Sequence, residues 1–297
     1  MENIHIPVLK EKVLEYLSPS DNKNFIDCTV GEGGHTKLIL DQNAPSGKVL
    51  GIDWDPAQIE SGKWLMADYK DRLILENSSY INLKEIVERI GFGPIEGVLL
   101  DLGMSSVHLD KSHKGFSFQL DQGLDMRYDD RFNFLTAERI LNEWKTEDIE
   151  KIIKEYGEEK FAKKIAERIT EERKKGRIKS TFQLAGIIKE AIPKKMQNGK
   201  IHCATRTFQA LRIAVNHELE NLEKVLPQVI SILPQGGKIV VISFHSLEDR
   251  IVKNFFNQKA KQKIIKILTK KPITAGSDEI RKNPRSRSAK MRVAVKL

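Results

Sequence analysis

Cysteine is scarce in this chain, and long hydrophobic segments are absent. The 297 residues include only two cysteines, Cys28 and Cys203, which are too few for a disulfide scaffold or a four-thiolate metal site. The longest apolar runs, such as residues 98–100 and 239–242, are far shorter than the roughly 20 residues that a helix needs to cross a bilayer. The N-terminus shows no basic stretch followed by an apolar segment, so no secretory signal is visible. We therefore expect a reduced, cytoplasmic protein without a membrane-spanning helix.

Charge is distributed unevenly along the sequence. The net charge of +9 comes from segments of opposite sign: −11 over residues 1–150 and −1 over residues 201–249, but +8 over residues 151–200 and +13 over residues 250–297. Clustered Lys and Arg indicate a nucleic-acid partner, because each neutralised phosphate releases counterions. Lysine-rich helices can also be simply solvated, and this alternative stays open for residues 151–200, where Glu is interleaved. Few acids compensate the charge of residues 250–297, which favours RNA or DNA as the partner.

Strand and helix patterns alternate through the first hundred residues. A helix is expected over residues 5–17, with Pro7 in its first turn. Short apolar runs then predict strands over residues 24–29, 48–53, 72–75, 97–101 and 238–243. Such alternation predicts an α/β fold with a mostly parallel, doubly wound sheet. Residues 264–268 and 291–295 are expected to add an antiparallel pair.

The alternation stops after Asp101. Helical patterns without a convincing strand fill the following hundred residues, at 136–144, 146–156, 160–174 and 181–191. We interpret residues 105–205 as a helical insertion in a discontinuous domain made of residues 1–104 and 206–297. One long helix over residues 208–233 is expected to lead back to the sheet.

A glycine-rich turn lies where the first predicted strand meets the next helix. It reads Asp27-Cys28-Thr29-Val30-Gly31-Glu32-Gly33-Gly34-His35. Such turns let a backbone approach a ligand closely, and the helix N-terminus favours anionic groups. Asp53 ends the next strand, where a carboxylate can bind ribose hydroxyls. The contiguous Gly33-Gly34 departs from the G-x-G-x-x-G pattern of dinucleotide sites, which favours S-adenosylmethionine over NAD, with Asp27 placed to meet the methionine amino group.

Two alternatives to a methyl-donor site remain at this point. An NAD-dependent oxidoreductase could use the same kind of sheet, and a non-catalytic RNA-binding protein could retain the fold. Polar segments also follow three other strands, at residues 77–80, 101–106 and 243–250. Each could be a capped helix start, and Ser246 with Asp249 nearly fits a capping box. Phe244 and His245 are not required for a cap, which favours a functional role for the last segment.

Ordered motifs make essentially the whole chain resemble the bacterial 16S ribosomal RNA cytosine-N4 methyltransferases, the RsmH or MraW family. These motifs occupy residues 5–9, 27–35, 101–106, 115–118, 124–127, 205–212, 243–250 and 285–290. The resemblance implies a class I S-adenosylmethionine-dependent methyltransferase, with a Rossmann-like, mostly parallel sheet and an inserted all-helical domain for substrate recognition. It also implies methylation of cytosine 1402 in the decoding region of the small ribosomal subunit. The implied partners are 16S rRNA or the 30S subunit, with no membrane and a possible homodimer.

The resemblance also implies site residues. Its cofactor contacts fall on Gly33, Gly34, His35, Asp53, Tyr80, Asp101 and His108. Two of these depart from the family, which commonly has Phe at the position of Tyr80 and Gln at that of His108. No metal is expected.

An exocyclic amine can be methylated without a covalent enzyme intermediate, whereas carbon-5 methylation of cytosine needs a cysteine nucleophile. Neither cysteine of this chain is placed for that role. We expect Asp101, Ser105 and carbonyls near Met104 to accept the N–H groups of the target amine. Phe244 and His245 are expected to stack on or orient the base.

Overall fold

The computed structural model describes residues 6–105, 112–197 and 201–297, apart from the side chains of residues 64–67. The chain forms two compact units. The first comprises Met1–Gly103 and Leu219–Leu297, and the second comprises Met104–Glu218. The second unit is longer than the insertion expected over residues 105–205, because it also takes in the helix that follows residue 204.

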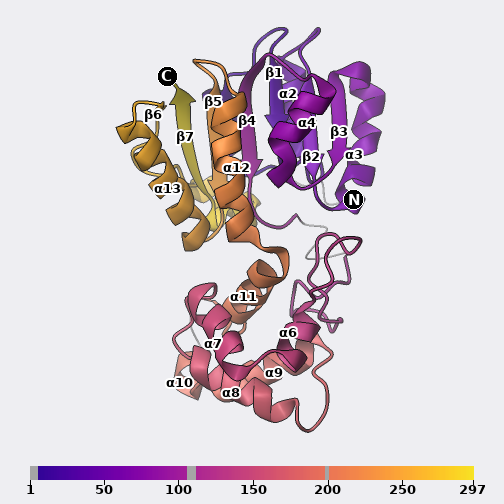
Figure 1. Cartoon of the computed structure of the whole chain (residues 1–297), viewed down its shortest axis with the longest axis vertical. Coiled ribbons are helices and arrows are strands. Elements are labelled where there is room, and N and C mark those ends of the chain that lie inside the picture. Colours follow the sequence, from indigo (N-terminus) through magenta and orange to yellow (C-terminus); the bar gives the residue numbers. More distant parts are fainter. Residues whose placement is uncertain (1–5, 106–111, 198–200) are drawn as a thin grey trace. The chain divides into compact units, whose positions relative to one another are not determined.

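A seven-stranded sheet forms the centre of the first unit (Figure 1). Its strands are β1 (Asn24–Asp27), β2 (Val49–Asp53), β3 (Leu73–Asn77), β4 (Ile95–Asp101), β5 (Lys238–Ser243), β6 (Ile265–Ile267) and β7 (Lys290–Lys296). They lie in the order β3-β2-β1-β4-β5-β7-β6, and only the pairings of β7 with β5 and β6 are antiparallel. The predicted parallel sheet and the antiparallel pair are confirmed. The carboxyl ends of β1 to β5 therefore meet at one edge.

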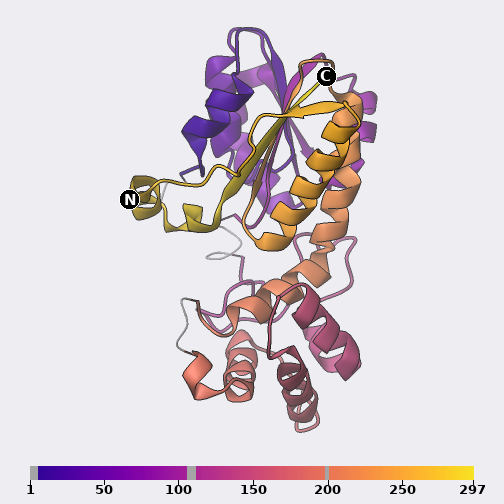
Figure 2. The ribbon, with the colours of Figure 1, turned by 90° about the vertical axis from the view of Figure 1, so that its left-hand side faces the viewer.

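Helices cover both faces of this sheet (Figures 1 and 2). On one face, the apolar cluster of the sheet includes residues from α4 (Leu83–Ile90), α12 (Glu218–Ile232) and α13 (Ser246–Lys261). On the other face, a second apolar cluster includes residues from α1 (Lys10–Leu17) and α2 (Gly34–Gln42). The remaining helices of the unit are α3 (Pro56–Tyr69), α14 (Ser277–Lys282), η1 (Lys70–Arg72), η2 (Tyr80–Asn82) and η3 (Pro284–Ser288). Because both faces are covered, β4 is apolar along most of its length without alternation.

The first helix starts later than the sequence pattern predicts. It begins at Lys10, after Leu9 in a left-handed conformation with φ 54°. Pro7 therefore lies outside the helix, and the prediction that it occupies the first turn is wrong. Its ring instead packs against Gly34, where an added Cβ would lie 2.7 Å from the Pro7 Cγ. The chain before α1 thus contacts the start of α2.

The second unit is helical around its own apolar cluster. Its helices are α6 (Ala137–Glu143), α7 (Thr146–Glu155), α8 (Ala162–Glu172), α9 (Thr181–Ala191), α10 (Lys194–Gln197) and α11 (Thr205–Asn216). The four helices predicted between residues 136 and 191 are confirmed. Among the residues that the structure describes in both units, no helix is long and apolar enough to cross a membrane.

The predicted single helix over residues 208–233 is wrong, because α11 and α12 are separated at His217. This residue has φ 51°, a left-handed conformation that ends α11. Asn216 fixes the break: its Nδ2 donates to the Met126 carbonyl at 2.7 Å, and its Oδ1 accepts from the Tyr128 amide at 3.0 Å. These contacts come from residues distant in the chain, so a local helical pattern could not reveal them.

Candidate active site

Two glycines shape the turn between β1 and α2. Gly31 and Gly33 have φ +53° and +79°, conformations that glycine adopts without steric cost. Gly33 is the N-cap of α2, and the Gly31 amide donates to Asp53 Oδ2 at 2.9 Å. The next residue, Gly34, leaves room for Pro7. Packing against Pro7 therefore explains why residue 34 is glycine. The left-handed backbone of the turn explains the glycines at positions 31 and 33.

Asp27 supports this turn from inside the protein. Its side chain is 1% exposed; its Oδ2 accepts from the Thr36 hydroxyl at 2.7 Å and its Oδ1 from the Thr29 amide at 3.1 Å. Burial raises the pKa of Asp27, and the hydrogen bond from Thr36 opposes that shift. Asp27 holds the strand end and the helix start together, and its contact with a ligand's amino group stays a prediction.

Asp53 lies at the carboxyl end of β2, beside the turn. Its Oδ1 accepts from the Asp55 amide at 2.9 Å, and its Oδ2 binds Gly31 as described. A carboxylate at the end of the second strand of such a sheet is the kind of group that binds ribose hydroxyls. Asn77 at the end of β3 donates to the Asp53 carbonyl at 3.0 Å. Tyr80 follows in η2, half-buried against an apolar cluster of the sheet.

Asp101 ends β4 at the same edge. Its amide donates to Thr29 Oγ1 at 2.7 Å, and its Oδ2 lies 3.5 Å from His35 Nε2. Among the described residues, Asp101 Oδ1 and both ring nitrogens of His35 are buried without a hydrogen-bond partner, as are Glu32 Oε1 in the glycine turn and Ser243 Oγ at the end of β5. Buried polar atoms are nearly always paired in proteins, so a group of unpaired ones indicates that a ligand completes the site.

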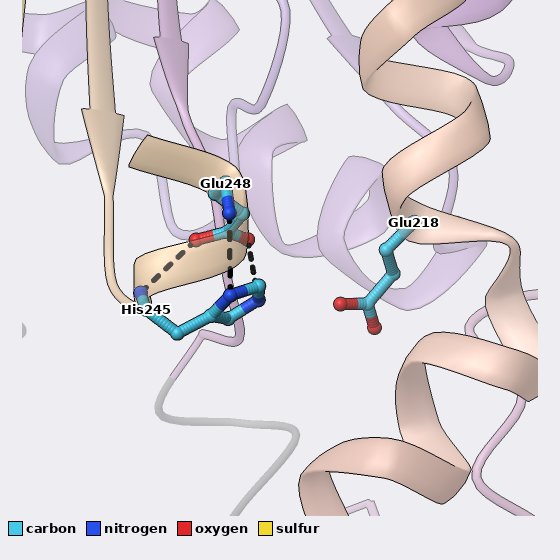
Figure 3. A group of neighbouring side chains, drawn as sticks. All are labelled: Glu218, His245 and Glu248. Carbon is cyan, nitrogen blue, oxygen red and sulfur yellow. Dashed lines mark hydrogen bonds and ion pairs between the residues drawn. The ribbon is translucent and has the colours of Figure 1, made fainter. Parts of the chain in front are cut away.

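His245 follows β5 and caps α13 (Figure 3). Its Nδ1 accepts from the Glu248 amide at 3.4 Å, while Glu248 Oε2 accepts from the backbone amides of Phe244 and His245. This reciprocal arrangement is a capping box. It lies one residue before the Ser246 and Asp249 box suggested by the sequence.

Phe244 and His245 therefore have structural roles that the sequence did not reveal. Phe244 packs against Gly103, where an added Cβ would lie 2.9 Å from its ring. The His245 side chain is 9% exposed, and its Nε2 lies 3.2 Å from Glu248 Oε1. Their roles in stacking on or orienting a base stay predictions.

The remaining predicted residues lie elsewhere. Ser105 belongs to the second unit, and His108 lies outside the described residues. Cys28 is fully buried beside Asp27, and burial raises the pKa of its thiol well above its ordinary value. Cys203 is half-buried in the second unit. A buried thiol with a raised pKa is a poor nucleophile, which agrees with the expectation for Cys28; that Cys203 is not the nucleophile stays a prediction.

Thr29 is a site residue that sequence reasoning missed. Its hydroxyl accepts from the Asp101 amide, and its own amide donates to Asp27, so it joins the ends of β1 and β4. In the sequence, its position two residues after Asp27 was the signal that could have identified Thr29 as a site residue.

The motif at residues 205–212 has an internal role in the second unit. Gln209 donates to the Tyr156 carbonyl at 2.9 Å, and Arg212 forms two hydrogen bonds of 2.8 Å with the Glu218 carboxylate. Arg206 donates to the Glu158 carbonyl. Through these hydrogen bonds, the side chains of α11 hold other segments of the helical unit in place.

Known proteins match the chain along its length. The profile of the MraW methylase family matches residues 2–297. Proteins named ribosomal RNA small subunit methyltransferase H from Sulfurihydrogenibium sp. and Persephonella marina are each 46% identical over 293 residues, covering 99% of both chains. The protein of that name from Clostridioides difficile is 43% identical over 312 residues, covering 100% of both.

Proposed function

Because the chain belongs to the MraW methylase family, we propose that it methylates the N4 amine of a cytosine in 16S rRNA, at position 1402. The observation that carries the proposal is the Asp101 carboxylate at the end of β4: its side chain is 18% exposed, and its Oδ1 has no hydrogen-bond partner in the described residues. It offers an acceptor for an N–H group. Neither alternative, the NAD-dependent oxidoreductase or the non-catalytic RNA-binding protein, is favoured by membership in a methylase family.

The chain is a methyltransferase, and its site fits S-adenosylmethionine. The turn at the start of α2 has two left-handed glycines beside Asp53, whose carboxylate would accept from ribose hydroxyls. Tyr80 would lie beside the adenine. The cofactor supplies an electrophilic methyl group on a positively charged sulfur.

The target amine is a weak nucleophile, because its lone pair is delocalised into the ring. Bound S-adenosylmethionine would give its methyl group to the nitrogen and keep the electron pair of the broken carbon–sulfur bond on sulfur, and the nitrogen would release one proton to the Asp101 carboxylate or to water. In this proposal Asp101 accepts a hydrogen bond from the amine N–H, orients the nitrogen lone pair toward the methyl group and stabilises the positive charge that develops on nitrogen. Ser105 and the Met104 carbonyl are further proposed acceptors. The base must leave its stack to reach this edge of the sheet.

The partner in this proposal is 16S rRNA, free or in the 30S subunit, which places the protein in the cytoplasm. The helical second unit would recognise the RNA, and the basic residues 250–297 would bind its phosphates. In η3, Arg285 and Arg287 are exposed, while Ser286 between them is buried and its hydroxyl donates to the Asn283 carbonyl. The segment thus presents two guanidinium groups on an anchored backbone. A homodimer stays a prediction.

Replacing both Arg285 and Arg287 by glutamine should weaken RNA binding and flatten its salt dependence. Each lost phosphate contact lowers the slope of log K against log salt by about 0.7 to 0.9. Fluorescence anisotropy with a labelled 16S rRNA fragment, at salt concentrations from about 50 to about 300 mM, measures the binding constant and its slope against salt. Lys48→Gln, an exposed lysine in the acidic half of the chain, is the matched control. An unchanged slope in the double variant would remove this segment from the RNA interface.

Asp53→Asn should weaken S-adenosylmethionine binding by about tenfold to a hundredfold. A hydrogen bond to a charged group contributes about 1.5 to 3 kcal/mol, and the amide keeps only one of the two acceptor oxygens. Isothermal titration calorimetry gives the Kd, with Asp41→Asn, an exposed carboxylate of the same unit, as the control. A Kd within about twofold of the wild-type value would contradict the assignment of Asp53 to the cofactor, because the loss of one such hydrogen bond should change the Kd by more than that.

The proposed function is tested by offering a labelled methyl donor with undermodified 30S subunits, free 16S rRNA and duplex DNA in separate reactions. Label should enter ribosomal RNA, free or assembled. Label that enters only DNA or protein overturns the proposal.

A further inference from the structure

The imidazole of His35 is buried at the start of α2 without a hydrogen-bond partner. Its side chain is 6% exposed, and neither ring nitrogen is paired within the described residues. A buried imidazole in this state has lost its water without gaining a replacement. Packing alone would favour an apolar side chain at such a position. The unpaired ring therefore indicates that this side chain has a polar role and not only a packing role.

The polar group nearest to this ring is the carboxylate of Asp101. His35 Nε2 lies 3.5 Å from Asp101 Oδ2, while Oδ1 is the buried, unpaired oxygen described above. The backbone of Asp101 is fixed by its bond to Thr29, so its carboxylate can change direction only by rotating its own side chain. Hydrogen bonds of catalytic groups are often long in free enzymes and shorten when ligands bind. A slight rotation of the imidazole would bring Nε2 into hydrogen-bond range of Oδ2.

A second carboxylate lies below this pair. Asp27 interacts electrostatically with both His35 and Asp101, and its own oxygens are held by Thr36 and Thr29. Asp27 is thus already engaged, whereas Asp101 is not. His35 Nε2 lies beside the carboxylate that still needs a donor, and in the tautomer that carries its proton on Nε2 it would supply one.

We propose that His35 is a positioning residue for Asp101: its Nε2–H holds the carboxylate through Oδ2 and so fixes the orientation in which that carboxylate accepts a hydrogen bond from the target amine. The inference rests on the proposed function, because it assigns Asp101 the amine as its partner. It adds a role for the side chain of His35 to the cofactor contact that the family resemblance implies for this position. A backbone contact to the cofactor would tolerate any side chain here, whereas the positioning role requires a donor at Nε2.

Two substitutions separate these roles. His35→Gln retains a side-chain N–H donor of similar reach, while His35→Leu retains bulk and removes the donor. We expect His35→Leu to lower kcat about 30-fold and to change the Kd of S-adenosylmethionine by less than about threefold, since a lost orienting bond acts on the transition state. His35→Gln should recover kcat to within about fivefold of the wild type. Calorimetry and labelled methyl transfer to 16S rRNA supply the two constants.

A double-mutant cycle with Asp101→Ala adds a readout that general destabilisation would not move. If His35 acts through the Asp101 carboxylate, His35→Leu should cost less than about threefold in the Asp101→Ala background. A loss of about 30-fold in kcat in that background, equal to the effect of His35→Leu alone, overturns the inference. Equal losses in His35→Gln and His35→Leu, or a change confined to the Kd, overturn it as well. An inactive wild type would overturn the proposed function and the inference with it, whereas an active wild type with unaffected variants overturns the inference alone.

Discussion

Asp101→Ala lowers kcat for methyl transfer by about a thousandfold, the largest catalytic effect expected in this protein. The substitution removes the carboxylate that we propose as the acceptor of a hydrogen bond from the amine, and it would leave the developing positive charge without a counter-charge. It also removes a cofactor contact implied by the family resemblance, so the Kd of S-adenosylmethionine should rise, by about tenfold or less. Single-turnover kinetics at saturating cofactor separate the two effects.

Asp101→Asn and Asp41→Ala complete this experiment. The asparagine keeps an acceptor oxygen but not the charge, and it should recover part of the lost rate. Asp41 is an exposed carboxylate on α2, and its loss should leave kcat unchanged. Full activity of Asp101→Ala with near-normal cofactor affinity would exclude Asp101 from the chemistry.

Gly115→Ala should destabilise the second unit by about 3 kcal/mol, the largest expected effect on stability. Gly115 has φ +78°, and an added Cβ would lie 2.0 Å from the Gly123 carbonyl oxygen. A left-handed conformation costs a side-chain-bearing residue about 1 to 2 kcal/mol, and relieving an overpacked contact costs about 1 to 3 kcal/mol more. Urea unfolding followed by circular dichroism gives the free energy of unfolding.

Gly123 provides the matched control for that substitution. It lies across the same close contact, but an added Cβ there meets no described atom within 4 Å. Gly123→Ala should change stability by about 0.5 kcal/mol or less. Similar losses in the two variants would mean that the close approach of the backbone at Gly115 is not what requires glycine.

The sheet was predictable because its signals are local. Each parallel strand is a short apolar run that ends in a polar residue or a turn, as β4 does at Asp101. The glycine turn was predictable for the same reason. The break at His217 was not, since it depends on hydrogen bonds from Asn216 to Met126 and Tyr128.

The site residues were predictable as a set but not in their individual roles. Sequence placed Asp27, Asp53 and Asp101 at strand ends that meet at one edge, and the structure has them there. It could not show that Asp27 is buried under the turn or that His245 caps α13. Those roles depend on which neighbours a fold supplies, as with the Thr36 hydroxyl that binds Asp27.

The most direct test of the account identifies the methylated atom. Undermodified 30S subunits are treated with the protein and S-adenosylmethionine, the 16S rRNA is digested to nucleosides, and tandem mass spectrometry separates N4-methylcytidine from 5-methylcytidine and ribose-methylated cytidine. The account predicts N4-methylcytidine, at a single position of the decoding region, and its absence with the Asp101→Ala variant. 5-Methylcytidine as the product would contradict it, because carbon-5 methylation needs a cysteine nucleophile that this site does not provide.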